Sequence, residues 1–253
     1  MRLRIVFAVL LILSMSTAAA VTAQDLPTCA DLPDHAALTA ALIEARQADN
    51  GGFDLDMWAT IVSRDGEVCA VAFTGENWGD QWPGSRVISA QKANTANAFS
   101  LPGLALSTAN LFTATQPGGS LYGLQHSNPV DTAVAYGGDA ALFGSQQDPM
   151  VGHRIGGVNV FGGGLPLYAS DGTLLGALGV SGDSSCADHN IAWRTRDALG
   201  LDYVPAGVSA TGDDNIIYDI EAGVSAGGFG HPVCAEGVDA IGDALPEIHP
   251  LGE

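Results

Sequence analysis

The sequence predicts an α+β fold in which helices pack on an antiparallel sheet. Two Asp-Gly pairs, Asp65-Gly66 and Asp171-Gly172, each lie between short apolar runs, which is typical of β-hairpins. Segments with apolar residues at helical spacing lie before, between and after these hairpins. Because hairpin strands are antiparallel and the helices lie between hairpins, a doubly wound parallel sheet is not expected.

The elements follow in a defined order. Asp34 is a suitable N-cap for the first helix and Ser85 for the second, and Pro and Gly residues separate the later segments. The pattern predicts a helix over 34–48, strands over 57–63 and 68–74, helices over 86–99 and 104–115, strands over 165–169 and 174–181, and a helix from 183 or 184 to about 199.

Two segments lack this regularity. Residues 116–162 are rich in Gly, Asn, Asp and Gln, and a segment of this length is usually functional or ordered by short elements. We expect an insertion that packs over one end of the sheet. The tail after residue 200 contains one predicted strand, over 215–219, and Gly and Pro interrupt the rest.

The first 23 residues have the features of a secretory signal peptide. Arg2 and Arg4 precede an apolar run that is shorter than the ~20 residues needed to span a bilayer. Val21-Thr22-Ala23 matches the small-x-small pattern that precedes a cleavage site. We expect cleavage after Ala23, a periplasmic or secreted location and no membrane insertion afterwards; an uncleaved anchor is the alternative.

The remaining chain is expected to form one domain over 24–200, including the insertion, followed by a C-terminal extension over 201–253. The composition of the full chain is strongly acidic, with 9 Lys and Arg against 28 Asp and Glu and a formal net charge of -19. Phosphate binding needs clustered Lys and Arg, so nucleic acid is not an expected partner. We favour solubility, in a salty habitat for example, over specific cation binding as the explanation of the acidity.

Four cysteines suggest two disulfides in an exported chain. Four cysteines allow three pairings, and the sequence alone does not choose between them. We prefer Cys29–Cys69 and Cys186–Cys234, because each bridge would then tie a terminal segment to the nearest part of the core. No pair has CxxC spacing, so neither a zinc site nor a redox motif is expected.

An ordered set of short motifs resembles the GlcG/HbpS family, the DUF336-like haem-degrading domain. Each motif is common by itself, and the resemblance rests on their order over residues 55–200. The motifs are Asp65-Gly66, Gly84-Ser85, Lys-Ala-Asn-Thr-Ala at 92–96, Gly-Gly-Leu-Pro at 163–166, Asp171-Gly172 and Gly-Ala-Leu-Gly-Val-Ser-Gly at 176–182. The long insertion and the C-terminal tail depart from the family pattern, and both could change a ligand site.

The resemblance implies a profilin-like or PAS-like fold, with a five-stranded antiparallel sheet and helices on its faces. It also implies homo-oligomers, and haem binding in some members. Other members are accessory proteins of glycolate, diol or corrinoid metabolism. The family name mentions haem degradation, but the resemblance does not by itself establish catalysis.

Several residues of these motifs are candidates for ligand binding. Lys92 and Thr95 are about one helical turn apart and share a face, and Lys92 could pair with a haem propionate or another carboxylate. The alternatives are a salt bridge to a neighbouring acid for Lys92 and simple packing for Thr95. The Gly163-Gly164 pair could admit a ligand close to the backbone or form a plain turn. The candidate set is Ser85, Lys92, Thr95, Gly163, Gly164 and Ser181.

A haem iron would need an axial His, Met, Tyr or Cys. His126 and His153 lie in the insertion, close in sequence to Tyr122 and Met150, and are the candidate axial ligands. Each could instead be a surface or structural histidine. No pair of histidines has the spacing of a zinc motif.

Three functions remain open. The first is an exported protein that binds haem or a related tetrapyrrole. The second is an accessory or enzyme-like protein that binds a small organic acid or cofactor. The third is a structural oligomer that docks a partner without a small ligand.

Overall fold

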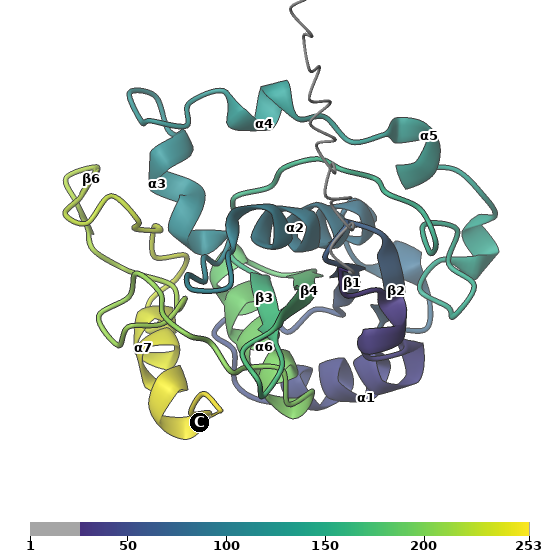
Figure 1. Cartoon of the computed structure of the whole chain (residues 1–253). Helices are drawn as coiled ribbons and strands as arrows, with labels where there is room; N and C mark the ends of the chain where they lie inside the picture. Colours follow the sequence, from purple (N-terminus) through teal and green to yellow (C-terminus); the bar gives the residue numbers. More distant parts are fainter. Residues whose placement is uncertain (1–25, 253) are drawn as a thin grey trace, which may run out of the picture.

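The computed structural model describes residues 26–252, and a four-stranded antiparallel sheet lies at its centre (Figure 1). The strands are β1 (Trp58–Ser63), β2 (Val68–Phe73), β3 (Gly164–Tyr168) and β4 (Leu174–Ser181), in the order β2-β1-β4-β3. The two hairpins lie side by side because β1 pairs antiparallel with β4. The predicted α+β class with an antiparallel sheet is therefore confirmed.

The described residues form four strands in this sheet, and the expected fifth strand is not confirmed. Backbone N–H and C=O groups along the outer edge of β3 instead form hydrogen bonds with loop residues. Gly164 accepts a hydrogen bond from Thr108 N (3.0 Å) and donates one to Thr108 Oγ1 (2.9 Å). Farther along, Tyr168 N donates to Leu201 O at 2.9 Å. These contacts occupy polar groups of β3 that a fifth strand would otherwise use.

Helices cover both faces of the sheet (Figure 1). On one face lie α1 (His35–Arg46) and α6 (Ser185–Ala198), which also pack against each other, and on the other lies α2 (Ser85–Phe99). Asp34 and Ser184 cap α1 and α6 by accepting backbone N–H groups of their first turns. In α2 the cap position belongs to Gly84, and the predicted cap Ser85 is the first helical residue.

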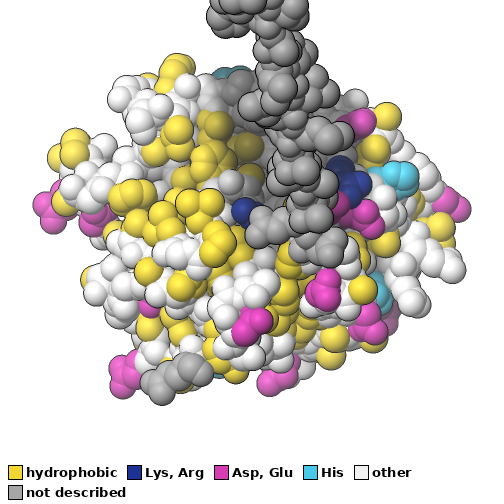
Figure 2. All heavy atoms as spheres, in the orientation of Figure 1, with side chains coloured by type: hydrophobic (Ala, Val, Ile, Leu, Met, Phe, Trp, Pro, Cys, Tyr) yellow, Lys and Arg dark blue, Asp and Glu magenta, His cyan; other side chains and the backbone are white. Residues whose placement is uncertain are grey.

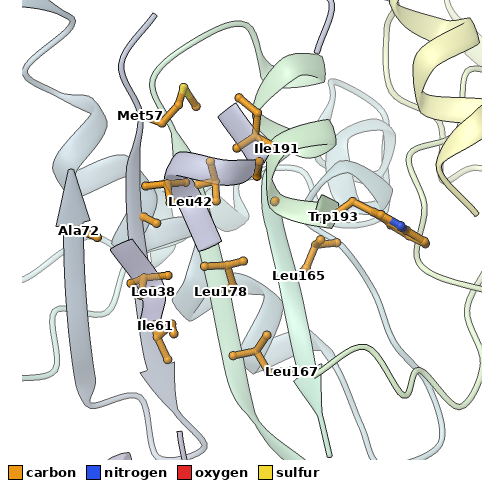
Figure 3. Close-up of a cluster of buried hydrophobic side chains, with 14 of the residues drawn as sticks. Leu38, Leu42, Met57, Ile61, Ala72, Leu165, Leu167, Leu178, Ile191 and Trp193 are labelled. Carbon is orange, nitrogen blue, oxygen red and sulfur yellow. The ribbon is translucent and has the colours of Figure 1, made fainter. Parts of the chain in front are cut away.

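The main hydrophobic core lies between the sheet and the α1–α6 layer. Figure 3 shows leucines of α1 facing apolar side chains of the strands, with residues of α6 closing one side. This is the apolar stripe that the sequence predicts for the first helix. Members shown in Figure 3 include Leu38, Leu42, Ile61, Leu165, Leu178 and Ile191.

The opposite face of the sheet holds α2 very closely. A Cβ atom on Gly179 of β4 would lie 1.9 Å from Ser89 O of α2, so only glycine permits this approach. A second cluster joins α2 to the sheet and to the insertion, through residues such as Trp58, Val87 and Met150.

The insertion packs mainly on α2. It contains α4 (Leu124–Ser127), α5 (Thr132–Ala135) and a 3₁₀ turn, Ala140–Leu142, and its segments run across the outer side of α2 (Figure 1). Asn94 Nδ2 donates to Gly157 O at 2.7 Å. The insertion also contacts the edge of β2, where Val68 exchanges backbone hydrogen bonds with Gly152 and His153. The insertion thus covers a helix more than an end of the sheet.

The predicted helix over 104–115 is wrong for its first half. Only a 3₁₀ turn, Ala109–Leu111, and the single turn α3 (Phe112–Thr115) form there. Leu104 instead makes a β-bridge with Leu101, and Ala105 N donates to Ala206 O at 2.7 Å. The local bridge and the bond to a distant segment together keep residues 104 and 105 out of the helix.

The tail is more ordered than predicted. The expected strand at 215–219 is wrong: a short hairpin of β5 (Ile220–Glu221) and β6 (Val224–Ser225) follows it. The helix α7 (Val238–Ile248) was not predicted from the sequence. It packs against α6 and contributes Leu245 to the main core. Gly242 and Pro246 resemble helix breakers, but both lie inside this helix.

Two disulfides are present, and each joins the partners that we preferred from the sequence. Cys29–Cys69 has an S–S distance of 1.98 Å and Cys186–Cys234 one of 2.03 Å.

The predicted signal peptide, residues 1–23, lies outside the described residues. Within residues 26–252, no helix is both long enough and apolar enough to cross a membrane. Figure 2 shows acidic side chains scattered over the visible face, with few basic ones among them.

Candidate functional site

A cavity of about 260 Å³ lies beside the first turns of α2 and α6, near the end of β4. Three of the six predicted ligand-binding residues, Ser85, Lys92 and Ser181, line it. Three of the motifs that carry the family resemblance, at 84–85, 92–96 and 176–182, therefore meet at one place, although they are far apart in the sequence. The complete lining is Trp82, Gly84, Ser85, Ile88, Lys92, Phe161, Ser181, Asp183, Ser185 and Asp188.

A buried ion pair forms the charged part of this cavity. Lys92 Nζ lies 2.6 Å from Asp188 Oδ2 and donates to Val180 O at 3.0 Å. Asp188 Oδ1 accepts a hydrogen bond from Asp183 N at 2.9 Å. Of the two predicted readings of Lys92, the structure therefore contains the salt bridge to a neighbouring acid.

Burial dominates the electrostatics of this pair. Loss of water raises the pKa of Asp188 to about 6, although the nearby Lys92 opposes the shift. The same burial lowers the pKa of Lys92, and Asp188 partly offsets it. The two partners are held together at neutral pH, and Lys92 has its charge already compensated.

Asp183 connects the cavity to the loop after α1. Its carboxylate accepts hydrogen bonds from the backbone N–H of Phe53 at 2.8 Å and of Leu55 at 3.3 Å. An acid in this position therefore organises backbone that passes close to the cavity, and its oxygens are already paired.

The rim of the cavity is aromatic and apolar. Trp82 is 52% exposed and Phe161 is 44% exposed, and Ile88 of α2 lies in the same lining. Trp82 also packs edge-to-face against Phe53, with ring centroids 6.2 Å apart. Exposed aromatic side chains around a cavity with a few polar groups are typical of ligand sites.

The other three predicted ligand-binding residues have structural contacts. Thr95 Oγ1 donates to Gln91 O and accepts from Asn159 N, so it joins α2 to the insertion. Gly163 has φ of 112°, and a Cβ there would lie 2.4 Å from Val180 O. A Cβ on Gly164 would lie 2.4 Å from Thr108 Cγ2. None of the three lines the cavity.

The two candidate axial histidines lie apart from this cavity. His126 is exposed at the end of α4, and His153 is exposed where the insertion meets β2. Neither is among the lining residues. Either could ligate an iron only at another position or from a neighbouring subunit.

Six lining side chains were not among the predicted ligand-binding residues: Trp82, Ile88, Phe161, Asp183, Ser185 and Asp188. Asp183 was predicted only as a possible start of the helix that contains Asp188. Trp82, Ile88 and Ser185 belong to local patterns typical of loops or helices, and only the fold brings them together. A lone acid in the first turn of an otherwise buried helix was the one local signal that could have indicated Asp188.

The lining fits part of a haem. Its apolar rim suits the edge of a porphyrin, and its hydroxyl groups suit a polar substituent. Among the ten lining residues, however, there is no His, Met, Tyr or Cys to ligate the iron. Lys92, the one cation in the lining, is already paired with Asp188. The cavity therefore fits the ring better than the iron.

Comparison with known proteins agrees with the motifs. A family model described as "Haem degrading protein HbpS-like" matches residues 32–196. Among solved structures, the chain is similar to a PduOC–haem complex, with 26% identity, a TM-score of 0.44, and coverage of 65% of this chain and 90% of that one. For protein ORFY of Klebsiella pneumoniae, from family DUF336, these values are 23%, 0.46, 73% and 97%. For HbpS they are 16%, 0.43, 71% and 94%. A comparison with curated proteins finds no match.

Proposed function

The chain belongs to the HbpS-like family, and on that premise we propose that it is an exported protein that binds haem or a related tetrapyrrole. The observation that supports this proposal is the cavity in which Ser85, Lys92 and Ser181 lie beneath an apolar rim. A role in storage, sensing or protection would follow from reversible binding.

Different lining residues would contact different parts of a bound tetrapyrrole. Trp82, Ile88 and Phe161 would contact the apolar ring and exclude water from it. Ser85 and Ser181 offer hydroxyl groups to a polar substituent, and the Lys92–Asp188 pair holds α2 and α6 at a fixed distance. A bound haem would supply a redox-active iron, whose axial ligand must come from outside this lining.

A haemin titration followed by absorbance tests the proposal. We expect a saturable, shifted Soret band at about one equivalent per subunit. Trp82→Ala and Phe161→Ala should each weaken binding about tenfold or more, because buried aromatic contacts are typical hot spots. Trp78→Ala is the matched control, because Trp78 is also a partly exposed tryptophan of the same loop but does not line the cavity. A non-saturating response would refute haem binding, and equal losses in all three variants would refute binding at this cavity.

The axial ligand is tested separately with His126→Ala and His153→Ala. If one variant loses the Soret shift, that histidine ligates the iron. If both keep the shift, the ligand is a different residue. Sedimentation of the wild-type protein with and without haemin would show whether a proposed homo-oligomer accompanies binding.

A small organic acid is the second candidate ligand. The cavity's modest volume and the hydroxyl groups of Ser85, Ser181 and Ser185 favour it. Saturable thermal stabilisation by small carboxylates, competing with haemin, would support this reading. Concentration-dependent assembly with no response to either ligand would instead support a structural, partner-docking oligomer.

A further inference from the structure

Three side chains that can bind metal converge on one carbonyl group in the tail. His231 Nδ1 donates to Pro232 O at 2.8 Å, and Cys186 Sγ and Cys234 Sγ lie 3.5 and 3.9 Å from the same oxygen. Nδ1 is also 4.0 Å from Cys186 Sγ. One potential ligand atom from each of the three residues lies within 4.8 Å of the other two. In the structure the two sulfur atoms are joined as a disulfide.

The surroundings of Cys234 favour a thiolate once that disulfide is opened. Its sulfur accepts a hydrogen bond from Cys186 N at 3.1 Å and lies 3.4 Å from Ser185 Oγ, at the first turn of the 14-residue helix α6. Backbone N–H groups at a helix N-terminus stabilise negative charge and lower a thiol pKa. Cys234 is exposed and Cys186 is buried, so an external thiol can reach the Cys234 sulfur.

Both disulfides have a backbone oxygen near their sulfurs, but only the other disulfide has a carboxylate beside one of them. Cys29 Sγ lies 3.8 Å from the carboxylate of Glu67, and Cys69 Sγ lies 3.5 Å from the backbone oxygen of Glu67. The negative charge of the Glu67 carboxylate disfavours a thiolate at Cys29, whereas the Cys186 N–H favours one at Cys234, so Cys29–Cys69 is the harder bridge to reduce. The chain therefore contains its own matched control for a thiol reaction at Cys186–Cys234.

His231 is a buried histidine with one ring nitrogen available to bind a metal ion. It is 1% exposed, and its Nε2 has no hydrogen-bond partner within the part of the chain that the structure describes. The nitrogen that lies 4.0 Å from Cys186 Sγ is Nδ1, which donates to Pro232 O, so the ring must turn for the unpartnered Nε2 to bind a cation beside the sulfurs. Residues 226–237 form neither helix nor strand, so His231 and Cys234 can adjust when the S–S bond opens.

We propose that reduction of Cys186–Cys234 creates a Zn²⁺ site formed by the two thiolates and a ring nitrogen of His231. A dithiol reductant transfers two electrons and two protons to the bridge and becomes a disulfide itself. Zn²⁺ then displaces the two thiol protons, which are released to solvent. The fourth position is left for water or Ser185 Oγ, as in other Cys₂His zinc sites.

The net charge of the proposed zinc complex is compatible with a largely buried site. Two thiolates and a neutral imidazole neutralise Zn²⁺, so a largely buried complex has no net charge. Sulfur and imidazole ligands select Zn²⁺ over Mg²⁺ or Ca²⁺. No cysteine or histidine spacing in the sequence matches a zinc motif, and the fold brings Cys186 within reach of the His231–Cys234 pair despite a separation of 48 residues between the cysteines.

The test uses two full-chain double variants, each with one cysteine pair. Cys29→Ser/Cys69→Ser keeps only the proposed site, and Cys186→Ser/Cys234→Ser keeps only the control pair. Each protein is reduced with a phosphine, desalted and titrated with Zn²⁺ against a chromogenic chelator. The first should bind one Zn²⁺ per chain, release two protons at a pH below the thiol pKa values, and bind none when oxidised. The second should bind at least a hundredfold more weakly.

The role of His231 is measured in the first background. His231→Ala should weaken Zn²⁺ binding more than tenfold, and His249→Ala, another histidine of the tail, should not. Zn²⁺ should also raise the Tm of the reduced first variant but not of the second, which shows that the metal is bound by folded protein. Equal binding by both double variants, binding by oxidised protein, or an unchanged affinity in His231→Ala would each overturn the proposal.

Discussion

Lys92 and Asp188 form an ion pair that almost no water reaches, with a 2.6 Å contact. A buried pair of this kind contributes little compared with apolar residues of the same size, but removing one partner leaves an uncompensated charge. The pair connects α2 to α6 past the end of β4, because Lys92 also donates to Val180 O. It therefore holds the cavity together more than it offers a free charge to a ligand.

Lys92→Met should destabilise the fold by about 3–5 kcal/mol at pH 8, because the Asp188 carboxylate is then buried without a cation. Urea denaturation gives the free energy of unfolding. Lys92→Met/Asp188→Asn should recover part of the loss, since no charge is left buried. A loss below about 1 kcal/mol in the single variant would show that water reaches the carboxylate.

Two buried histidines make the stability depend on pH. Burial lowers the pKa of His189 to about 3 and of His231 to about 4, from 6.5. Below pH 6.5 the unfolded chain binds protons that the folded chain does not, so stability is lost as the pH falls toward 4. Asp188 acts in the opposite direction below about pH 6, because burial raises its pKa to about 6.

Each histidine should cost about 2 kcal/mol of stability between pH 7 and pH 5, from ~1.4 kcal/mol per pKa unit. His189→Gln should remove one of these two contributions and so flatten the decline. Urea denaturation at pH 7, 6 and 5 measures both proteins. His126→Gln, at an exposed position, is the control and should follow the wild type. An unchanged slope in His189→Gln would mean that His189 is not buried in its neutral form.

At the scale of elements, Arg86 of α2 makes a buried ion pair with the insertion, in addition to the hydrogen bonds of Asn94 and Thr95. Arg86 Nε donates to Asp148 Oδ2 at 2.8 Å and its Nη1 to Ala135 O at 2.9 Å. Its guanidinium also lies over the Phe143 ring, 3.7 Å from the centroid. Both partners of the ion pair are buried. A segment with few regular hydrogen bonds is thus fixed by side-chain contacts.

Arg86→Met should loosen the insertion, because Asp148 stays buried without its cation. We expect protease cleavage within residues 136–147 to become at least tenfold faster in native conditions. Arg154→Met is the matched control: its ion pair with Asp65 is exposed, so its loss should leave the cleavage rate close to that of the wild type. Equal cleavage of both variants would indicate that the insertion is held by other contacts.

The predicted strands and helices agree with the structure where turn residues and apolar spacing give a strong local signal. All four strands of the main sheet were predicted to within one residue, because Asp-Gly turns and apolar runs are local features. The start of the 104–115 helix failed because Ala105 bonds to Ala206, a residue about a hundred positions away. The helix α7 was missed because Gly242 lowers local helix propensity, whereas Ile216 and Tyr218 pack close to that glycine.

At the scale of the whole molecule, the tail is part of the fold. Arg196 of α6 forms a two-pronged ion pair with Asp214, at 2.7 and 2.8 Å, and both side chains are fully buried. Trp193 Nε1 donates to His249 O at 3.0 Å, and Leu245 lies in the main core. The proposed boundary at residue 200 therefore separates segments that share one core.

A chain that ends at Gly200 should lose cooperative unfolding, because Arg196 would be buried without Asp214 and the core would lose Leu245. Near-UV circular dichroism and urea denaturation measure this. Val224→Ser in the full chain is the control, since Val224 is 68% exposed and should change stability little. A truncated chain that unfolds cooperatively with wild-type stability would establish the tail as a separate extension.

The sequence by itself determined the family, the hairpins and the principal helices, because ordered motifs, turn residues and apolar spacing are properties of short segments. It also indicated Ser85, Lys92 and Ser181 as candidate ligand-binding residues, and these three line one cavity. Only the tertiary structure decided that Lys92 is neutralised by Asp188, that Thr95 and the Gly163-Gly164 pair serve packing, and that Cys186, His231 and Cys234 meet. Those outcomes depend on distances between segments far apart in the chain, which burial and close packing set and no local pattern encodes.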